Sequence, residues 1–386
     1  MRRVDTTQRL RAAEAAVSPE ELTAALDDPS PEVARVAMRR LVGLLGAGAA
    51  AALRARVLRV DLSLVADFTK ALQRIGDDEV LGIATTALQD ERSTRRLAAV
   101  RALGALADRR AVQQLRAALD DDVGGVRAAA LDALAQLGED GGASIGAECG
   151  RLVSDPIPHV RIAAVRAVAR LVAHPGPMLA PAVGDQDRLV RLAVARHARS
   201  LPERSARALL GDPDLRVREA AARAAGAREI GVLAVLLVED PARDVRRAAA
   251  HALGAMRDPR VADLLLPGLE DRDPLVRAAA LHAVEDLLTN PGVVRRLCDE
   301  LESERADRRR ACLYALARLD VRVGEAAVSR AASDPDPDVR LALVHSAESL
   351  LDEPGPLMVY LASDANEAVR QGAEMWLIRA TPAEPS

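Results

Sequence analysis

Apolar residues recur along this chain with the spacing of helices, and the pattern itself returns about every 31 residues. Within each period Leu, Val and Ala stand three and four residues apart, which is typical of helices with one apolar face. Strands are not expected, because β-branched and aromatic residues do not gather in alternating runs. The clearest copy spans residues 271–281, where Asp271 precedes Arg277 by six residues and an alanine-rich helical run follows.

We take the arginine of this motif as the marker of each repeat. Twelve equivalent positions lie 27 to 34 residues apart, and ten of them are arginine: Ala34, Val65, Arg96, Arg127, Arg161, Arg191, Arg218, Arg246, Arg277, Arg309, Arg340 and Arg370. Ten of the residues six positions earlier are aspartate: Asp28, Asp90, Asp121, Asp155, Asp185, Asp212, Asp240, Asp271, Asp334 and Asp364. The short intervals around Arg218 predict a change of superhelical curvature between about Pro202 and Asp240.

Each repeat is expected to hold an amphipathic helix A, an Asp-Pro type of turn and a helix B that begins near the marker. One such pair cannot bury both of its faces, so neighbouring pairs must stack. The position six after the marker supports stacking, because it is small in most repeats, whereas Arg40 and Trp376 stand there in the end repeats. We therefore expect a capping helix within residues 1–17, one continuous solenoid over 18–378, and a flexible tail over 379–386.

This organisation resembles HEAT repeats, and among them the short type called phycobilisome-lyase HEAT-like repeats. The resemblance covers nearly the whole chain and rests on the repeat length, the Asp-Pro turn and the Val-Arg start of helix B. It implies an all-α, right-handed alpha-alpha superhelix of about twelve helix pairs. It also implies a ladder of turn aspartates and marker arginines between neighbouring repeats, interrupted in repeats 1, 2 and 10 by Ala34, Val65, Arg59 and Ser303.

The distribution of charge limits the classes of partner that we expect. The whole chain is slightly acidic, with 53 Lys and Arg against 57 Asp and Glu, which argues against a general polyanion binder. The geometry of the resembled family places helix B on the concave side, with the fifth position after the marker most exposed. Together with the first and ninth positions, that row holds thirteen Lys or Arg against three Asp or Glu. Ten of its residues form the predicted binding row: Arg39, Lys70, Arg101, Arg166, Arg196, Arg223, His251, His282, Tyr314 and His345.

Three interpretations of this row remain open. The arginines could be solvated helix formers in a chain whose only lysine is Lys70. They could line a groove for an acidic, extended protein segment. They could instead bind nucleic acid, although few aromatic residues are present to stack on bases. We expect a non-enzymatic scaffold or adaptor for an acidic protein partner, with a nucleic-acid binder as the alternative and an accessory lyase subunit as a further one, implied only by the resemblance.

Neither a metal nor another cofactor is expected. His251, His282 and His345 fall in different repeats, and packed helices lie roughly 8–10 Å apart, too far for shared coordination. His282 with Glu285, and His345 with Glu348, have a spacing that could reach one ion. However, the iron-binding members of the resembled family use adjacent His-Glu residues, and this chain has no such dipeptide.

Motifs of catalysis are missing from the sequence, which contains no nucleophile elbow, phosphate-binding glycine loop or dinucleotide fingerprint. Cys149, Cys298 and Cys312 are expected to be buried, reduced thiols, which fits a reducing cytoplasm. We expect no secretory segment and no membrane partner, and we expect a monomer. His197 and Trp376 are interpreted as structural residues, the second as part of the C-terminal cap.

Overall fold

The computed structural model describes residues 6–138, 142–285, 287, 291–318, 321 and 323–380. Every regular element in these ranges is helical, so the all-α class predicted from the sequence is confirmed. The helices group into two compact units, Met1–Val194 and Ala195–Ser386, where the repeat pattern predicts one continuous stack.

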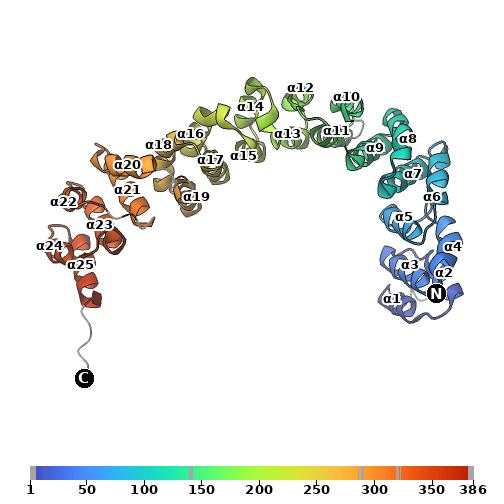
Figure 1. Cartoon of the computed structure of the whole chain (residues 1–386), viewed down its shortest axis with the longest axis horizontal. Coiled ribbons are helices and arrows are strands. Elements are labelled where there is room, and N and C mark those ends of the chain that lie inside the picture. The colour runs from blue at the N-terminus through green and yellow to red at the C-terminus, as the bar shows by residue number, and fades with distance from the viewer. Residues whose placement is uncertain are drawn as a thin grey trace. The chain divides into compact units, whose positions relative to one another are not determined.

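Helix pairs build each unit in two layers, which can be followed in Figure 1. The B helices, which carry the markers, are α3 (Pro31–Leu45), α5 (Val65–Arg74), α7 (Ser93–Leu106), α9 (Gly124–Leu137), α11 (Pro158–Leu171), α13 (Arg188–Ala195), α15 (Leu215–Ala224), α17 (Arg243–Ala255), α19 (Pro274–Glu285), α21 (Ala306–Arg318), α23 (Pro337–Leu350) and α25 (Glu367–Ala380). The A helices are α2 (Pro19–Ala25), α4 (Ala50–Arg54), α6 (Glu79–Ala87), α8 (Val112–Ala117), α10 (Gly142–Arg151), α12 (Gly176–Leu179), α14 (Glu203–Leu210), α16 (Ile230–Glu239), α18 (Ala262–Leu265), α20 (Pro291–Asp299), α22 (Glu325–Ala332) and α24 (Gly355–Leu361).

Short 3-10 segments complete several repeats. They are η1 (Gly46–Ala49), η2 (Arg109–Ala111), η3 (Ala118–Asp120), η4 (Leu152–Ser154), η5 (Ala180–Gly184), η6 (Ala198–Ser200), η7 (Ala227–Glu229), η8 (Pro259–Val261), η9 (Leu266–Glu270) and η10 (Glu300–Glu302). Together with the paired helices they account for the predicted twelve repeats, so the repeat count is confirmed.

The turn aspartate sets the entry to each B helix. Asp155, for example, ends η4 with φ −58° and ψ 143°, and its Oδ1 accepts a hydrogen bond of 2.9 Å from the amide of Ile157. This local bond forms a turn that stops helix A and redirects the chain. Pro158 then occupies the first turn of α11, where a missing N–H costs nothing.

The core between B helices depends on small residues. Ala133, Ala167, Ala283 and Ala315 stand six residues after their markers and are buried, as predicted. The approach is very close where α17 meets α19: a Cβ added to Gly254 would lie 2.5 Å from the Cβ of Ala283. Glycine is therefore required at this position by the neighbouring helix and not by its backbone angles.

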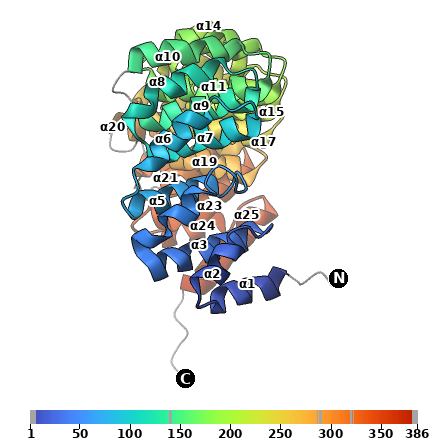
Figure 2. The same cartoon turned by 90° about the vertical axis from the view of Figure 1, so that its right-hand side faces the viewer.

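The two ends of the chain carry different elements. An additional helix, α1 (Thr6–Ala15), lies against α3 at the end of the first unit (Figure 2). At the other end α25 continues to Ala380, so Arg379 and Ala380 of the expected tail are helical. The remaining tail residues, 381–386, lie outside the described residues, as do residues 1–5 of the expected N-terminal segment.

One described stretch, Pro31–Arg54, is long and apolar enough to cross a membrane by length and composition. In the structure it is divided into α3, η1 and α4, with Gly46 at φ 52° between the first two. The buried side of α3 includes Val33, Ala37 and Leu41, and α3 packs against both α1 and α2. This packing is that of a repeat core helix.

Candidate binding surface on the B helices

The marker arginines and turn aspartates form the ladder that the resemblance implies. Within the two units the structure contains seven pairs, each joining one repeat to the next with an N–O distance of 2.6–2.8 Å: Arg96–Asp121, Arg127–Asp155, Arg161–Asp185, Arg218–Asp240, Arg246–Asp271, Arg309–Asp334 and Arg340–Asp364. The arginine Nε and Nη2 both donate to the carboxylate, which is the bidentate geometry favoured by a planar guanidinium.

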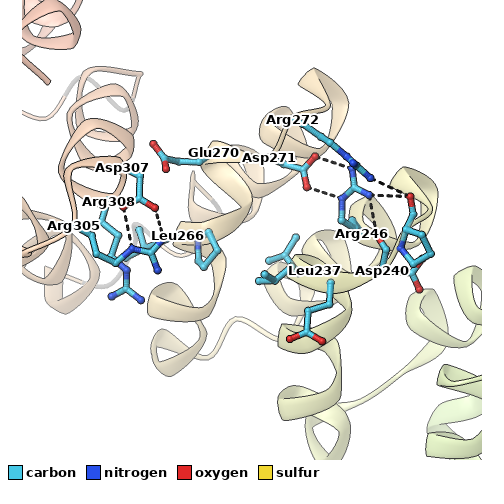
Figure 3. A pocket seen from close by; sticks show the side chains of 14 residues that line it. Leu237, Asp240, Arg246, Leu266, Glu270, Asp271, Arg272, Arg305, Asp307 and Arg308 are labelled. Carbon is cyan, nitrogen blue, oxygen red and sulfur yellow. Dashed lines mark hydrogen bonds and ion pairs between the residues drawn. The ribbon is translucent and has the colours of Figure 1, made fainter. Parts of the chain in front are cut away.

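Each ladder arginine also closes its own turn. Nη1 of Arg246 donates to the carbonyl of Asp240 at 2.9 Å, so one side chain binds the turn before its own helix and the turn of the next repeat (Figure 3). Burial pushes the pKa of Asp155 upward, but the hydrogen bonds from Arg127 and the Ile157 amide outweigh it and lower that pKa. The aspartate is therefore held as a carboxylate.

The ladder is interrupted where the sequence departs from the motif, and the contacts that take its place differ between these repeats. At the first repeat Asp28 is bound at 3.1 Å by Arg9 of α1, so the extra helix supplies the missing arginine. Asp90, which faces the repeat marked by Val65, is bound at 2.8 Å by Arg95 of its own helix. The third departure, Ser303, follows the repeat of Arg277 and gives that arginine no turn carboxylate.

All ten residues of the predicted binding row are exposed. Arg39, Lys70, Arg101 and Arg166 belong to the first unit, and the others belong to the second. The prediction that the fifth position after the marker faces solvent is therefore confirmed by the structure, whereas its role in binding stays a prediction.

Acidic residues within and beside the compared rows bind several of these cations. Arg166 pairs with Asp132 at 3.0 Å, and Arg223 pairs with Glu219 at 2.6 Å. Neighbouring cations behave similarly, since Arg35 pairs with Asp67 at 2.9 Å. The excess of thirteen cations over three acids therefore overstates the free positive charge of this surface.

Positive charge without such compensation gathers in a groove of about 880 Å³ on the B helices of the first unit. Lys70, Arg101 and Arg170 line it, together with His159, and the only carboxylate among its lining residues, Asp132, is bound to Arg166. Burial raises the pKa of Asp132. The rest of the lining is mostly apolar and belongs to α5, α7 and α9: Ala66, Leu97, Val100, Gly104, Ala105, Ala128, Ala129 and Ala133.

A second cleft, of about 510 Å³, lies between α19 and α21 in the other unit. Its basic lining residues are Arg272, Arg277, Arg310 and Arg318. Of the predicted row only Tyr314 lines this cleft, and its side chain is 44% exposed. A further cavity of about 510 Å³ lies around Arg305 and Arg308 (Figure 3). Glu270, Asp271 and Arg272, which form the turn before α19, line both openings.

The histidine row does not form one site. His282 lies 3.2 Å from Glu285 on its own helix, while Nδ1 of His345 lies 3.5 Å from the Tyr314 hydroxyl. Glu348, the other carboxylate proposed for a metal pair, accepts a hydrogen bond of 2.8 Å from the indole of Trp376. Among the described residues no group of three metal-binding side chains gathers.

The cysteines are free thiols in the structure. Cys149 and Cys312 are buried, as expected, whereas Cys298 is half-buried. Burial raises the pKa of Cys149 and of Cys312 to about 12, which keeps both protonated and unreactive at neutral pH. His197 is half-buried, and burial lowers the pKa of its imidazole, as suits an uncharged structural residue.

The predicted binding row does not include several residues that line these openings. His159 stands two residues before its marker, outside the compared rows, and the resemblance implies only a ladder role for Arg277. Arg170 and Arg318 belong to the ninth row and Arg310 to the first row, and none of them is in the predicted binding row. For Arg277 a signal was present, because Ser303 breaks the motif in the following repeat.

Known proteins support the fold. None of the curated proteins matches the sequence. Among solved structures, Kap121p aligns with 96% of this chain at 13% identity and a TM-score of 0.51, and this chain covers 48% of Kap121p. Kap95p, which binds RanGDP, aligns with 96% of the chain at 14% identity and a TM-score of 0.50, with 61% of Kap95p covered. The chain thus spans about half to three fifths of these larger proteins.

The family model described as HEAT repeats matches residues 63–135, 208–285 and 230–317, which include most of the residues that line the groove and the cleft described above. The short phycobilisome-lyase type stays a prediction. With its helix pairs, its Asp-Arg ladder and these matches, the chain contains HEAT repeats.

Proposed function

We propose that this protein is a non-enzymatic scaffold that binds an acidic, extended protein segment along its B helices. The observation that carries the proposal is the groove of about 880 Å³ in the first unit, with Lys70, Arg101 and Arg170 over an apolar floor. Lysine and arginine attract carboxylates, while the floor can cover the apolar side chains between them. Kap95p, whose fold is similar to that of this chain, binds RanGDP, which agrees with this class of function.

The lining and charge of the groove favour a polypeptide over nucleic acid. Its lining contains no Phe, Tyr or Trp side chain on which bases could stack. Three cations at one place also form a small footprint for a phosphate backbone, and the whole chain carries a net charge of −4. An apolar floor adds affinity for side chains such as leucine, which a phosphate backbone lacks.

A binding experiment with defined probes tests the proposal. The probes are a fluorescent peptide of alternating Glu and Leu residues and an oligonucleotide of equal charge. Reversal of Lys70, Arg101 and Arg170 to Glu should weaken peptide binding at least about tenfold, because three favourable charge contacts become repulsive. Reversal of Arg11, Arg110 and Arg151, which are exposed outside the groove, should leave it unchanged.

The two probes separate the alternatives. Tighter binding of the oligonucleotide, with a steep loss of affinity as salt increases, would replace the peptide proposal with nucleic-acid recognition. Equal peptide binding by the groove variant and the parent protein would reject the groove as the site. Circular dichroism of each variant confirms that the helices are retained.

A further inference from the structure

Arg277 differs from the ladder arginines because the partner position of the next repeat is a serine. Its Nη1 donates to the carbonyl of Asp271 at 2.7 Å and to that of Arg272 at 3.3 Å. These are the same turn contacts that Arg246 makes with Asp240 and Pro241. The guanidinium is therefore anchored as in a complete ladder step, while no described residue accepts a hydrogen bond from its Nε or Nη2.

The turn at Ser303 retains the backbone geometry of the aspartate turns. Its φ of −57° and ψ of 143° match the −58° and 143° of Asp155. Ser303 Oγ accepts a hydrogen bond of 3.4 Å from the amide of Arg305, where an aspartate would use one carboxylate oxygen. Nη1 of Arg309 also donates to the Ser303 carbonyl at 2.7 Å. Only the carboxylate is missing from an otherwise conventional turn.

The acids near Arg277 are already bound by other arginines. Asp271 accepts both donors of Arg246, with a shortest distance of 2.6 Å, and Glu270 accepts from Arg310 at 3.0 Å. Arg277 and Arg318 therefore bring positive charge into the α19/α21 cleft that these carboxylates do not neutralise. Leu281 and the ring of Tyr314 line the same cleft and offer apolar contact beside the charge.

We infer that this cleft binds a carboxylate side chain of an acidic peptide, which occupies the place of the aspartate missing at position 303. The incoming Asp or Glu accepts two hydrogen bonds from Nε and Nη2 of Arg277, in the geometry that the seven internal pairs show. An adjacent apolar residue of the peptide packs on Leu281 and Tyr314. The inference takes its class of partner from the proposed function, but it assigns a separate site in the second unit.

The first test needs no ligand. Ser303→Asp should complete the ladder between repeats 9 and 10 and raise the thermal midpoint by about 2 °C or more. Ser329→Asp, which adds the same charge at an exposed position of α22, should not raise it. Because no partner is added, this result does not depend on the groove of the first unit.

The second test uses a labelled Gly-Ser peptide with one Glu-Leu pair, and its Gln-Leu counterpart. It is made in the variant whose Lys70, Arg101 and Arg170 are Glu, so that the first-unit groove cannot contribute. Arg277→Ala should weaken Glu-peptide binding at least about tenfold, and Arg277→Lys should restore little of it, because lysine cannot bind a carboxylate bidentately. Ser303→Asp should abolish binding by filling the slot, and the Gln peptide should bind weakly throughout.

Two results would overturn the inference. One is an unchanged thermal midpoint in Ser303→Asp, which would show that Arg277 is not positioned for a carboxylate from that side. The other is equal binding of the Glu peptide by Arg277→Ala and its parent. If both tests succeed while the first-unit groove variant binds acidic peptide normally, the proposed groove fails and the cleft stands.

Discussion

At the scale of single residues, arginine rather than lysine holds the repeats together. One guanidinium reaches four acceptors at once: two oxygens of the next turn and two carbonyls of its own turn, as Arg246 does with Asp271, Asp240 and Pro241. A lysine ammonium could not satisfy this fixed fork. The strong preference of this chain for arginine therefore has a structural use at the ladder positions.

Removal of one ladder arginine should cost substantial stability. The side chain of Arg246 is 3% exposed and that of Asp271 8%, so Arg246→Ala leaves a carboxylate without its partner in a poorly solvated place. Loss of one member of a buried pair typically costs about 3 kcal/mol or more. Hydrogen exchange of the α17 and α19 amides should show the loss as faster local opening.

An exposed arginine on the same helix provides the control. Arg243 lies 3.3 Å from Asp273, and its side chain is 60% exposed. Arg243→Ala should therefore change stability by less than about 1 kcal/mol. Equal exchange rates for Arg246→Ala and Arg243→Ala would show that the ladder does not stabilise the stack.

At the scale of elements, small residues determine how closely B helices pack. Alanine normally stabilises a helix relative to glycine by about 1 kcal/mol. At Gly254 alanine should instead destabilise the protein, because an added Cβ would lie 2.5 Å from the Cβ and 2.7 Å from the Cα of Ala283. Gly254→Ala should lower the unfolding midpoint in urea, since α17 and α19 would have to separate.

Gly231 of α16 is the matched position without a neighbour. An added Cβ there meets nothing within 4 Å, so Gly231→Ala should leave the midpoint unchanged or raise it slightly. A higher midpoint in Gly254→Ala than in Gly231→Ala would contradict the close packing of α17 on α19.

The way in which neighbouring elements pack also determines which features could be predicted from the sequence. The helix pairs follow from one-dimensional periodicity, because each repeat meets the next through equivalent positions. The ladder and its interruption at Ser303 are implied by the resemblance to HEAT repeats. The pairing of Arg35 with Asp67 could not be predicted from those rows, since it joins positions that are not equivalent and depends on how two helices cross. For the same reason the groove at Lys70 and the cleft at Arg277 required coordinates, although the residues around both were visible in the repeat pattern.

At the scale of the whole molecule, the distribution of charge makes the proposed binding depend on local fields. The chain carries a net charge of −4, yet most of the charged residues that line the groove at Lys70 and the cleft at Arg277 are arginine or lysine. A body of the opposite sign limits indiscriminate attraction of polyanions, while the grooves attract carboxylates at short range. The groove lies in the first unit and the cleft in the second, so the two proposed sites can be tested independently.

Stability should also be divided along the chain, because each repeat contacts only its neighbours and the helices form two compact units. Trp376 is the only tryptophan, and its indole donates to Glu348 at 2.8 Å, so its fluorescence reports on the last repeats. Circular dichroism reports on all helices. We expect the fluorescence transition in urea to begin at a lower concentration than the dichroism transition, since the last repeat has a neighbour on one side.

Two ladder variants assign the transitions. Arg340→Ala removes the pair with Asp364 that joins α23 to the final turn, and should shift the fluorescence transition to lower urea. Arg127→Ala removes the corresponding pair with Asp155 in the first unit, and should change the dichroism curve while the fluorescence curve stays in place. The contrary result is that the fluorescence and dichroism curves coincide in the parent protein and that each variant shifts both curves together. The whole chain would then unfold as one cooperative unit, and the nearest-neighbour description would be wrong for this protein.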